Sequence, residues 1–370
     1  MVIMALDHTR DYFHWAAFIY SPTDPEHTTW AIFFTRWITH YCAPIFSLLA
    51  GVSAYMVGRR RSLSELSAFL LKRGIWLVFI EVVVVSFGWF FDIHYSTIAL
   101  QVIWVLGLSM IVLAGLVWLP RPAILIFSLV VIAGHNLLDG IHFDGSMLWA
   151  LIHERGAFQF GVFHIRVGYP LLPWIAVMSL GYWFGALYDP AYDAAKRKQQ
   201  LSIIGLSAIA LFIIIRWVNV YGDLKPWTHF ETISQSLMSF MNPTKYPPSL
   251  VYLLMTLGPA LIFLANSENL RGRVVDFFCT FGRVPFFYYI IHIYLIHILA
   301  MIAAQLTGFG WHAMILRDWV SGTPALHGYG FPLWVVYTVW ISVIIALYPL
   351  CKKFDAYKMA HKEKWWLSYL

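Results

Sequence analysis

Long apolar segments recur along the whole chain, separated by short polar stretches. A helix needs about 20 mostly apolar residues to cross the hydrocarbon core of a bilayer. On that measure the pattern predicts about ten membrane-spanning helices. They cover residues 1–19, 30–57, 69–91, 98–118, 121–138, 170–188, 201–220, 248–265, 278–304 and 332–351. The predicted fold is an all-α bundle of a polytopic membrane protein, forming one domain over residues 1–370.

Lys and Arg residues gather in alternate connections between these segments. Basic runs occur at residues 59–61 and 196–198, and again after the last segment. The opposite connections, 139–169, 221–247 and 305–331, are longer and hold few basic residues. Because cytoplasmic loops carry the excess of Lys and Arg, both termini are expected to be cytoplasmic. The long loops would then present a site on the other side.

Composition supports this class. The 370 residues are 60% hydrophobic and only 12% charged, whereas soluble domains are about 25% charged. The net charge of +6 lies in short loops, where topology explains it, so no nucleic-acid partner is expected. The three cysteines have no paired spacing that would indicate a disulfide framework or a zinc motif. We expect neither a metal nor a haem.

The first apolar segment carries an unusual set of ionisable residues. At about 100° per residue, one helix face holds four of them and His8 lies at its edge. The four are Asp7, Arg10, Asp11 and His14. A charged group in hydrocarbon costs from about 3 to above 10 kcal/mol, so such groups are candidates for a functional site.

The second segment carries a matching polar face. Arg36, Thr39 and His40 share it at i, i+3, i+4 spacing. The same face continues as a stripe of small residues, which lets another helix approach closely. The stripe is Ala43, Ser47, Ala50 and Ala54. We expect the two polar faces to meet, with Arg10 and Arg36 neutralising Asp7 and Asp11.

Weaker candidates lie further along the chain. The ninth segment holds Arg283, Tyr289 and His292, which could line a cavity, with His292 also readable as an interior histidine. Asn136 lies at the end of a predicted helix, where it either caps the helix or reaches the cavity. Lys245 precedes a Pro-rich helix start and is a further cavity candidate.

These residues suit more than one function. A histidine beside a carboxylate suits general base catalysis, as in acyl transfer. The same cluster suits a proton-coupled transporter or exporter, although no matched halves of the transporter kind are evident. A buried ion-pair lock between two helices, or a haem-binding electron carrier, are the remaining alternatives.

Several motifs resemble one family along nearly the whole chain. They are MALDHTRDYF, FFTRWITHYCAPIFSLLAG, LLKRGIWL, LQVIWVLGLSMI, GHNLLDG, NPTKYPPSLVYLL and GRVPFFYYIIHIYLIH. These stretches are similar to the bacterial DUF1624 family, which is grouped with the catalytic domain of heparan-α-glucosaminide N-acetyltransferase. The Arg- and Asp-containing stretch that usually precedes the first motif is absent here, so a truncated N-terminus is expected.

The resemblance implies a multi-pass acyltransferase of the bacterial inner membrane. It would take an acetyl group from cytoplasmic acetyl-CoA and deliver it to an extracytoplasmic sugar amine or hydroxyl. The family's implicated Asn corresponds to His8, and its implicated His corresponds to His27 in the loop that follows. Asp7 and Asp11 beside His8 complete the expected catalytic group. A homodimer is compatible with this interpretation.

Overall fold

The computed structural model describes residues 1–364, 366 and 367. Helices hold 69% of the residues and strands 5%, which confirms a mainly helical fold. Within the described residues, six helices are long and apolar enough to cross a membrane. They are Trp30–Gly58, Arg121–Leu138, Ala194–Val218, Leu250–Ser267, Pro285–Leu306 and Leu333–Ala360. The apolar helices Val102–Leu116 and Leu172–Tyr188 are shorter, so the count of ten spans stays a prediction.

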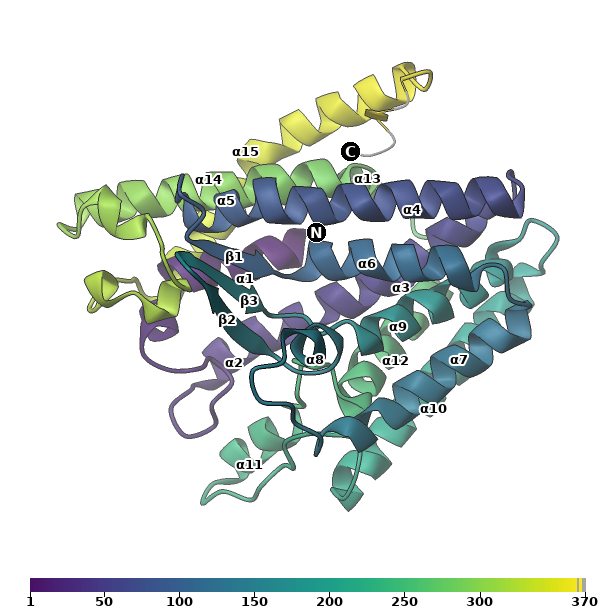
Figure 1. The fold of residues 1–370 in the computed structure, drawn as a ribbon, viewed down its shortest axis with the longest axis horizontal. Coiled ribbons are helices and arrows are strands. Elements are labelled where there is room, and N and C mark those ends of the chain that lie inside the picture. Colours follow the sequence, from purple (N-terminus) through teal and green to yellow (C-terminus); the bar gives the residue numbers. More distant parts are fainter. Residues whose placement is uncertain (365, 368–370) are drawn as a thin grey trace. The chain divides into compact units, whose positions relative to one another are not determined.

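The chain divides into two compact units. The first comprises Met1–Thr39, Val83–Thr97 and Leu270–Leu370. Within it, α1 packs against α14 and α15, and α14 also packs against α5 (Figure 1). Its helices are α1 (Val2–Phe13), α2 (Trp30–Trp37), α5 (Ser86–Phe90), α13 (Arg273–Arg283), α14 (Pro285–Leu306) and α15 (Leu333–Ala360). Single 3₁₀ turns are η1 (Trp15–Phe18), η6 (Trp311–Met314), η7 (Val320–Gly322) and η8 (Pro324–Leu326).

The first helix is shorter than predicted. It ends at Phe13, and His14 is extended. The backbone there pairs with a distant segment: Phe331 N donates to Phe13 O at 2.7 Å, and Trp15 N donates to Phe331 O at 3.2 Å. Gly330 permits this approach, since a Cβ added there would lie 2.4 Å from the Cα of Trp15. The expected helix over 1–19 is therefore wrong, because a long-range contact ends it.

The second unit comprises His40–Val82 and Ile98–Asn269. Its helices are α3 (Cys42–Gly58), α4 (Leu63–Ile80), α6 (Val102–Leu116), α7 (Arg121–Gly134), α8 (Met147–Ile152), α9 (Leu172–Phe184), α10 (Ala194–Val218), α11 (Ile233–Phe240) and α12 (Leu250–Ser267). The turns η4 (His135–Leu138) and η5 (Gly185–Tyr188) extend α7 and α9. The chain passes between the two units four times: within η2 (Ile38–Tyr41), within the π-helical turn η3 (Glu81–Val85), after Thr97 and after Asn269.

Three helix crossings in the second unit are built on pairs of glycines. At the crossing of α3 and α9, a Cβ on Gly51 would lie 2.0 Å from Met178 O, and one on Gly181 would lie 2.0 Å from Leu48 O. Such backbone contact needs glycine on both helices. The predicted small-residue stripe is buried here at Ala43, Ser47 and Ala54. The other two pairs are Gly74 with Gly107 (α4 and α6) and Gly205 with Gly258 (α10 and α12).

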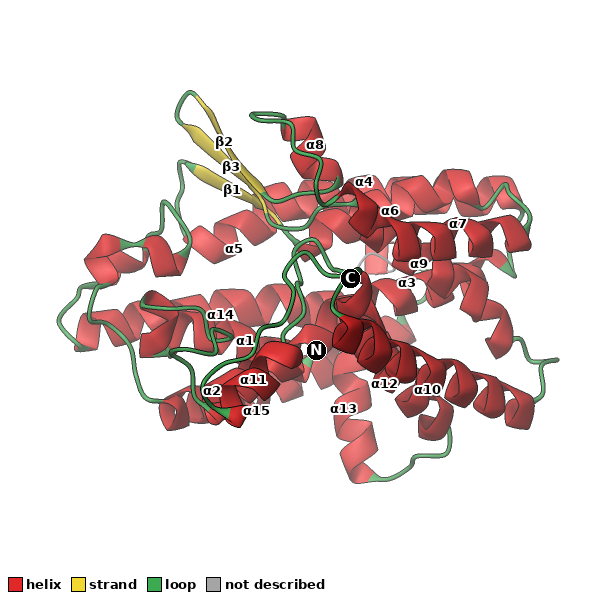
Figure 2. Cartoon of the chain, turned by 90° about the horizontal axis from the view of Figure 1, so that it is seen from below, coloured by secondary structure: helices red, strands yellow, loops and turns green. Residues whose placement is uncertain are grey.

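Two predicted loops contain regular structure. Residues 139–169 hold α8 and an antiparallel hairpin of β2 (Gly156–Phe160) and β3 (Phe163–Val167), and β3 also pairs with β1 (Thr97–Leu100). In Figure 2 the hairpin and α8 stand beside each other. Residues 221–247 hold α11. The predicted span 278–304 is two helices, because Pro285 starts α14 after a non-helical Val284.

Candidate active site

A histidine pair joins α1 to α14. Nδ1 of His8 lies 2.9 Å from Nε2 of His292, and the two rings are nearly parallel with centroids 4.9 Å apart. Nδ1 of His292 lies 2.7 Å from the carbonyl oxygen of Tyr288, one turn earlier on α14. Both imidazoles are buried, His8 at 9% exposure and His292 at 0%.

These contacts assign the hydrogens on both rings. The Tyr288 carbonyl only accepts, so Nδ1 of His292 carries the hydrogen and donates it. A neutral His292 then has its lone pair on Nε2, which accepts from Nδ1–H of His8. His8 in turn keeps its own lone pair on Nε2. The arrangement therefore holds His8 in the tautomer whose Nε2 can take a proton.

Aromatic side chains surround the pair. The ring of Trp89 meets His8 edge-on with centroids 4.7 Å apart, and Tyr289 does the same at 6.4 Å. The hydroxyl of Tyr12 donates to the carbonyl of Trp89 at 2.5 Å. Tyr289, predicted from sequence as a cavity residue, thus lies beside His8. Hydrogen bonds in such weakly polar surroundings are stronger than in water.

A network of charges lies next to the pair on α1. Arg36 of α2 donates to Asp7 at 2.5 Å, which confirms that the two polar faces meet. Arg10 contacts both Asp7 at 3.1 Å and Asp11 at 2.6 Å. Arg36 also donates to Thr39 at 2.8 Å, as the i, i+3 spacing predicts. Two arginines and two aspartates balance in charge, which lowers the cost of burying them.

Three predicted residues of the first unit have other partners. His14 has left the helix, and its Nδ1 accepts from Ala16 N at 3.2 Å. His27 lies in the loop before α2 with a 59% exposed side chain, and its Nδ1 lies 2.8 Å from Asp24. Arg283 ends α13 and pairs with Asp355 at 2.7 Å.

Three further predicted residues belong to the second unit. His40 packs its ring against that of Tyr252, whose hydroxyl donates to the His40 carbonyl at 2.7 Å. Lys245 is buried, with Nζ 5.1 Å from the centre of the Tyr246 ring. Asn136 donates to Asp139 at 2.8 Å and accepts from Leu250 N at 2.9 Å.

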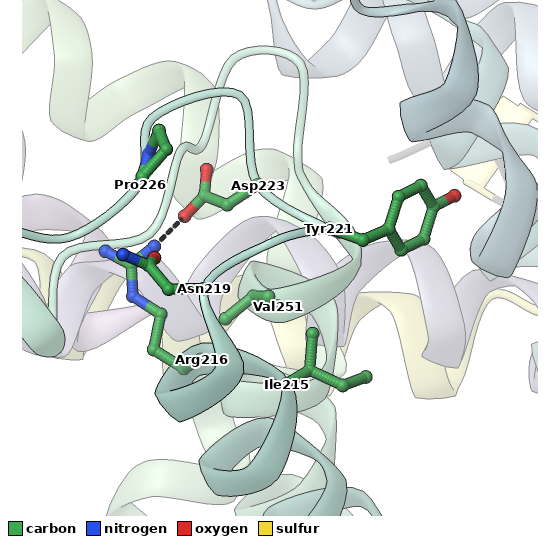
Figure 3. A pocket seen from close by; sticks show the side chains of 7 residues that line it. All are labelled: Ile215, Arg216, Asn219, Tyr221, Asp223, Pro226 and Val251. Atoms are coloured by element: carbon green, nitrogen blue, oxygen red, sulfur yellow. Dashed lines mark hydrogen bonds and ion pairs between the residues drawn. The ribbon is translucent and has the colours of Figure 1, made fainter.

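Arg216 is a buried charge that the sequence analysis missed. It pairs with Asp223 at 2.5 Å, and both side chains are at most 5% exposed. Burial raises the pKa of Asp223, and the charge of Arg216 opposes that rise. The pair lines a small hollow, and none of the predicted site residues lines it (Figure 3). Its position inside the apolar run IALFIIIRWV is the sequence feature that could have identified Arg216 as a candidate.

Two groups of side chains in the described part of the chain have donor atoms close enough for a metal ion. One is Asp24, Glu26 and His27, in the loop before α2, and only Asp24 among them is partly buried. The other is His135, Asp139 and His153, whose donor atoms all lie within 4.8 Å of one another and whose histidines are buried.

Comparison with known proteins supplies the family. No curated protein and no solved structure matches the chain. One family model matches residues 1–218, a range that includes His8 and Arg36 but not His292. Since that match covers more than half of the residues, the chain belongs to the family described as heparan-alpha-glucosaminide N-acetyltransferase, catalytic.

Proposed function

We propose that this protein is a membrane acetyltransferase in which His8 is the general base. Its family supports acetyl transfer, and its apolar helices support a membrane location. The observation that carries the role of His8 is the chain of contacts from His8 to His292 to the Tyr288 carbonyl. That chain leaves an accepting Nε2 on a buried imidazole of neutral tautomer, which is what a general base needs.

The donor is acetyl-CoA, which when bound supplies an acetyl group on a thioester. The acceptor is a sugar amine or hydroxyl. Nε2 of His8 takes the proton from the acceptor as its nitrogen or oxygen bonds to the acetyl carbon, and returns that proton to the sulfur as the carbon–sulfur bond breaks. His292 keeps accepting from Nδ1–H throughout, so the imidazolium formed between the two steps stays oriented.

The neighbouring charges hold His8 in place. Asp7 precedes it and binds both Arg36 and Arg10, so ion pairs fix one turn of α1 against α2.

In the proposed orientation both termini are cytoplasmic and acetyl-CoA binds from the cytoplasm. The acceptor would then bind on the opposite face of a bacterial cell membrane. The excess of Lys and Arg in alternate loops supports this orientation.

The test is turnover by the detergent-purified protein with acetyl-CoA and a panel of amino sugars and sugar alcohols. Release of free thiol and the mass of the acetylated product are measured together. We expect His8→Ala to lower kcat by about 10²–10⁴-fold, the usual contribution of a general base, with an unchanged circular dichroism spectrum.

His27→Ala separates the two histidines to which the family resemblance points. Its side chain is exposed and held by Asp24, so we expect its kcat to stay within about threefold of the wild type. A His27→Ala protein without activity, beside a fully active His8→Ala protein, would move the base to His27. If the protein neither binds acetyl-CoA nor turns over any acceptor at saturating acetyl-CoA, acetyl transfer is rejected and proton-coupled transport becomes the favoured function.

A further inference from the structure

The buried group of His135, Asp139 and His153 is assembled from two neighbouring stretches of the second unit. His135 begins the 3₁₀ turn that ends α7, Asp139 follows that turn, and His153 follows α8. Nε2 of His153 lies 3.0 Å from Oδ1 of Asp139, and the rings of His135 and His153 are 5.9 Å apart. Each histidine is 2% exposed.

Three of the four ring nitrogens in this group have no hydrogen-bond partner among the described residues. They are Nδ1 and Nε2 of His135 and Nδ1 of His153. Buried polar atoms are nearly always satisfied, so an unmatched histidine needs an explanation. An imidazole with no proton donor or acceptor nearby offers its lone pair to a cation.

The carboxylate is oriented by a second layer of contacts. The backbone N–H of Leu250 donates to Oδ1 of Asn136 at 2.9 Å, which turns the Asn136 amide nitrogen toward Asp139. That nitrogen donates to Oδ2 of Asp139 at 2.8 Å. Oδ1 is thereby left to face His153. Metal-binding carboxylates are commonly held by such outer hydrogen bonds.

We propose that His135, Asp139 and His153 bind Zn²⁺. Two imidazoles and one carboxylate are a donor set that zinc uses where a fourth position is left open. Ligand atoms around tetrahedral zinc are about 3.4 Å apart, and the donor atoms here all lie within 4.8 Å of one another, so no pair of them needs to approach by more than about 1.4 Å. The ion takes one lone pair from each side chain, ties the end of α7 to the segment after α8, and leaves a position for water.

The exposed group of Asp24, Glu26 and His27 provides a contrast. There Nδ1 of His27 already has a partner in Asp24, and most of the donors are in solvent. Acidic surface groups of this kind are common without an ion. The buried group differs in having unmatched nitrogens and an oriented carboxylate.

The experiment measures zinc bound to the full-length protein, purified in detergent through a tag without histidines, stripped with a chelator and re-equilibrated with Zn²⁺. We expect one zinc per chain. Co²⁺ in place of Zn²⁺ should give the visible absorption bands of a low-symmetry four-coordinate site. His135→Ala and Asp139→Asn should each weaken zinc binding by 100-fold or more, and Asn136→Ala by about tenfold.

Matched variants separate this site from others. His142→Ala removes an exposed histidine of the same segment, which pairs with Glu154 at 2.9 Å, and should keep full zinc binding. His27→Ala should do the same. His135→Cys keeps a donor atom and should add a thiolate-to-cobalt charge-transfer band, which also shows that the variant is folded. Absence of stoichiometric zinc, or loss of it in His27→Ala but not in His135→Ala, would overturn the proposal.

Discussion

Nδ1 of His8 and Nε2 of His292 are 2.9 Å apart although 284 positions separate the two residues in the chain. The Tyr288 carbonyl fixes the proton on the far side of His292. The hydrogen bond between the two rings therefore runs from Nδ1–H of His8 to Nε2 of His292, and the lone pair of neutral His8 is on its Nε2. In the proposed function, His292 would be a positioning residue and His8 the general base.

Removing His292 should slow transfer without removing the base. In His292→Ala the Nδ1–H of His8 loses its acceptor, so the tautomer with a lone pair on Nδ1 becomes equally accessible. We expect kcat to fall by about 100-fold with KM nearly unchanged, since a wrong tautomer impairs catalysis rather than binding. His292→Gln keeps an acceptor oxygen and should recover about tenfold. Steady-state kinetics of both variants provide the measurement.

His297→Ala is the matched control for that series. His297 is also buried on α14, but its ring nitrogens lie 2.9 Å from Gly88 O and 2.8 Å from Met314 O. Its loss should lower the unfolding temperature while kcat per folded molecule stays within about threefold. Equal kcat values for His292→Ala and His297→Ala would show that the contact with His8 has no positioning role.

The ion pair of Asp7 and Arg36 should show strong coupling. Each side chain is at most 15% exposed, and removing one partner leaves a nearly buried charge, at a cost of about 3 kcal/mol. Asp7→Asn and Arg36→Gln combined should cost less than the sum of the single changes, with an interaction energy of about 1–3 kcal/mol. Thermal or denaturant unfolding in detergent measures this cycle.

The ion pair of Arg283 and Asp355, in which only the arginine is exposed, is the control for that measurement. The Arg283 side chain is 51% exposed, so Arg283→Gln should cost less than about 1 kcal/mol. Additive effects of the Asp7 and Arg36 changes would contradict this coupling and would mean that Arg10, which also contacts Asp7, neutralises Asp7 when Arg36 is lost.

Sequence periodicity predicts features that depend on one helix. Asp7, Arg10 and Asp11 lie three and four residues apart, so their common face follows from helix geometry alone. The pairing of that face with Arg36 was predictable because the two segments are adjacent in the sequence and unusually charged. Composition likewise predicts a membrane fold, because soluble domains carry about twice this share of charged residues, and a chain that spans a bilayer must be helical or a closed barrel.

Features that depend on contacts between distant parts of the chain could not be predicted from the sequence. The end of α1 at Phe13 depends on pairing with Phe331, and nothing in the local sequence signals it. His292 was identified as a candidate but not as the partner of His8, since helix spacing carries no information between segments 284 positions apart. His135 and His153 were missed because they lie 18 positions apart, with a loop and a helix between them.

Two glycines with different surroundings, Gly51 at the crossing of α3 and α9 and Gly115 on α6, should respond to substitution in opposite ways. In Gly51→Ala the new Cβ would lie 2.0 Å from Met178 O and 2.6 Å from Tyr182 N, so the helices must move apart at a cost of about 3 kcal/mol. In Gly115→Ala, near the end of α6, nothing lies within 4 Å, and the better helix propensity should add about 0.5–1 kcal/mol. Unfolding midpoints in detergent should thus move down for Gly51→Ala and up for Gly115→Ala. A Gly51→Ala protein as stable as the wild type would mean that this crossing relaxes easily.

Arg216 should hold residues 221–247 against the end of α10. Its guanidinium donates to Asp223 and to the carbonyls of Phe240, Ser239 and Lys225 at 2.5–3.1 Å. A lysine has one compact ammonium and cannot reproduce this fork of donors. We therefore expect Arg216→Lys to open the segment and to raise the rate of trypsin cleavage at Lys225 about tenfold, as a loss of about 1.4 kcal/mol in local stability would.

Lys198→Ala is the control for that experiment, because Lys198 is an exposed cation near the other end of α10. Its cleavage rate at Lys225 should equal that of the wild type. Asp223→Asn is a second test variant. It keeps the carbonyl contacts of Arg216 but removes the opposing charge from a nearly buried pair. The rate of trypsin cleavage at Lys225 in this variant should lie between those of the wild type and Arg216→Lys. If Asp223→Asn were cleaved faster than Arg216→Lys, charge balance rather than the fork of hydrogen bonds would be what holds the segment closed.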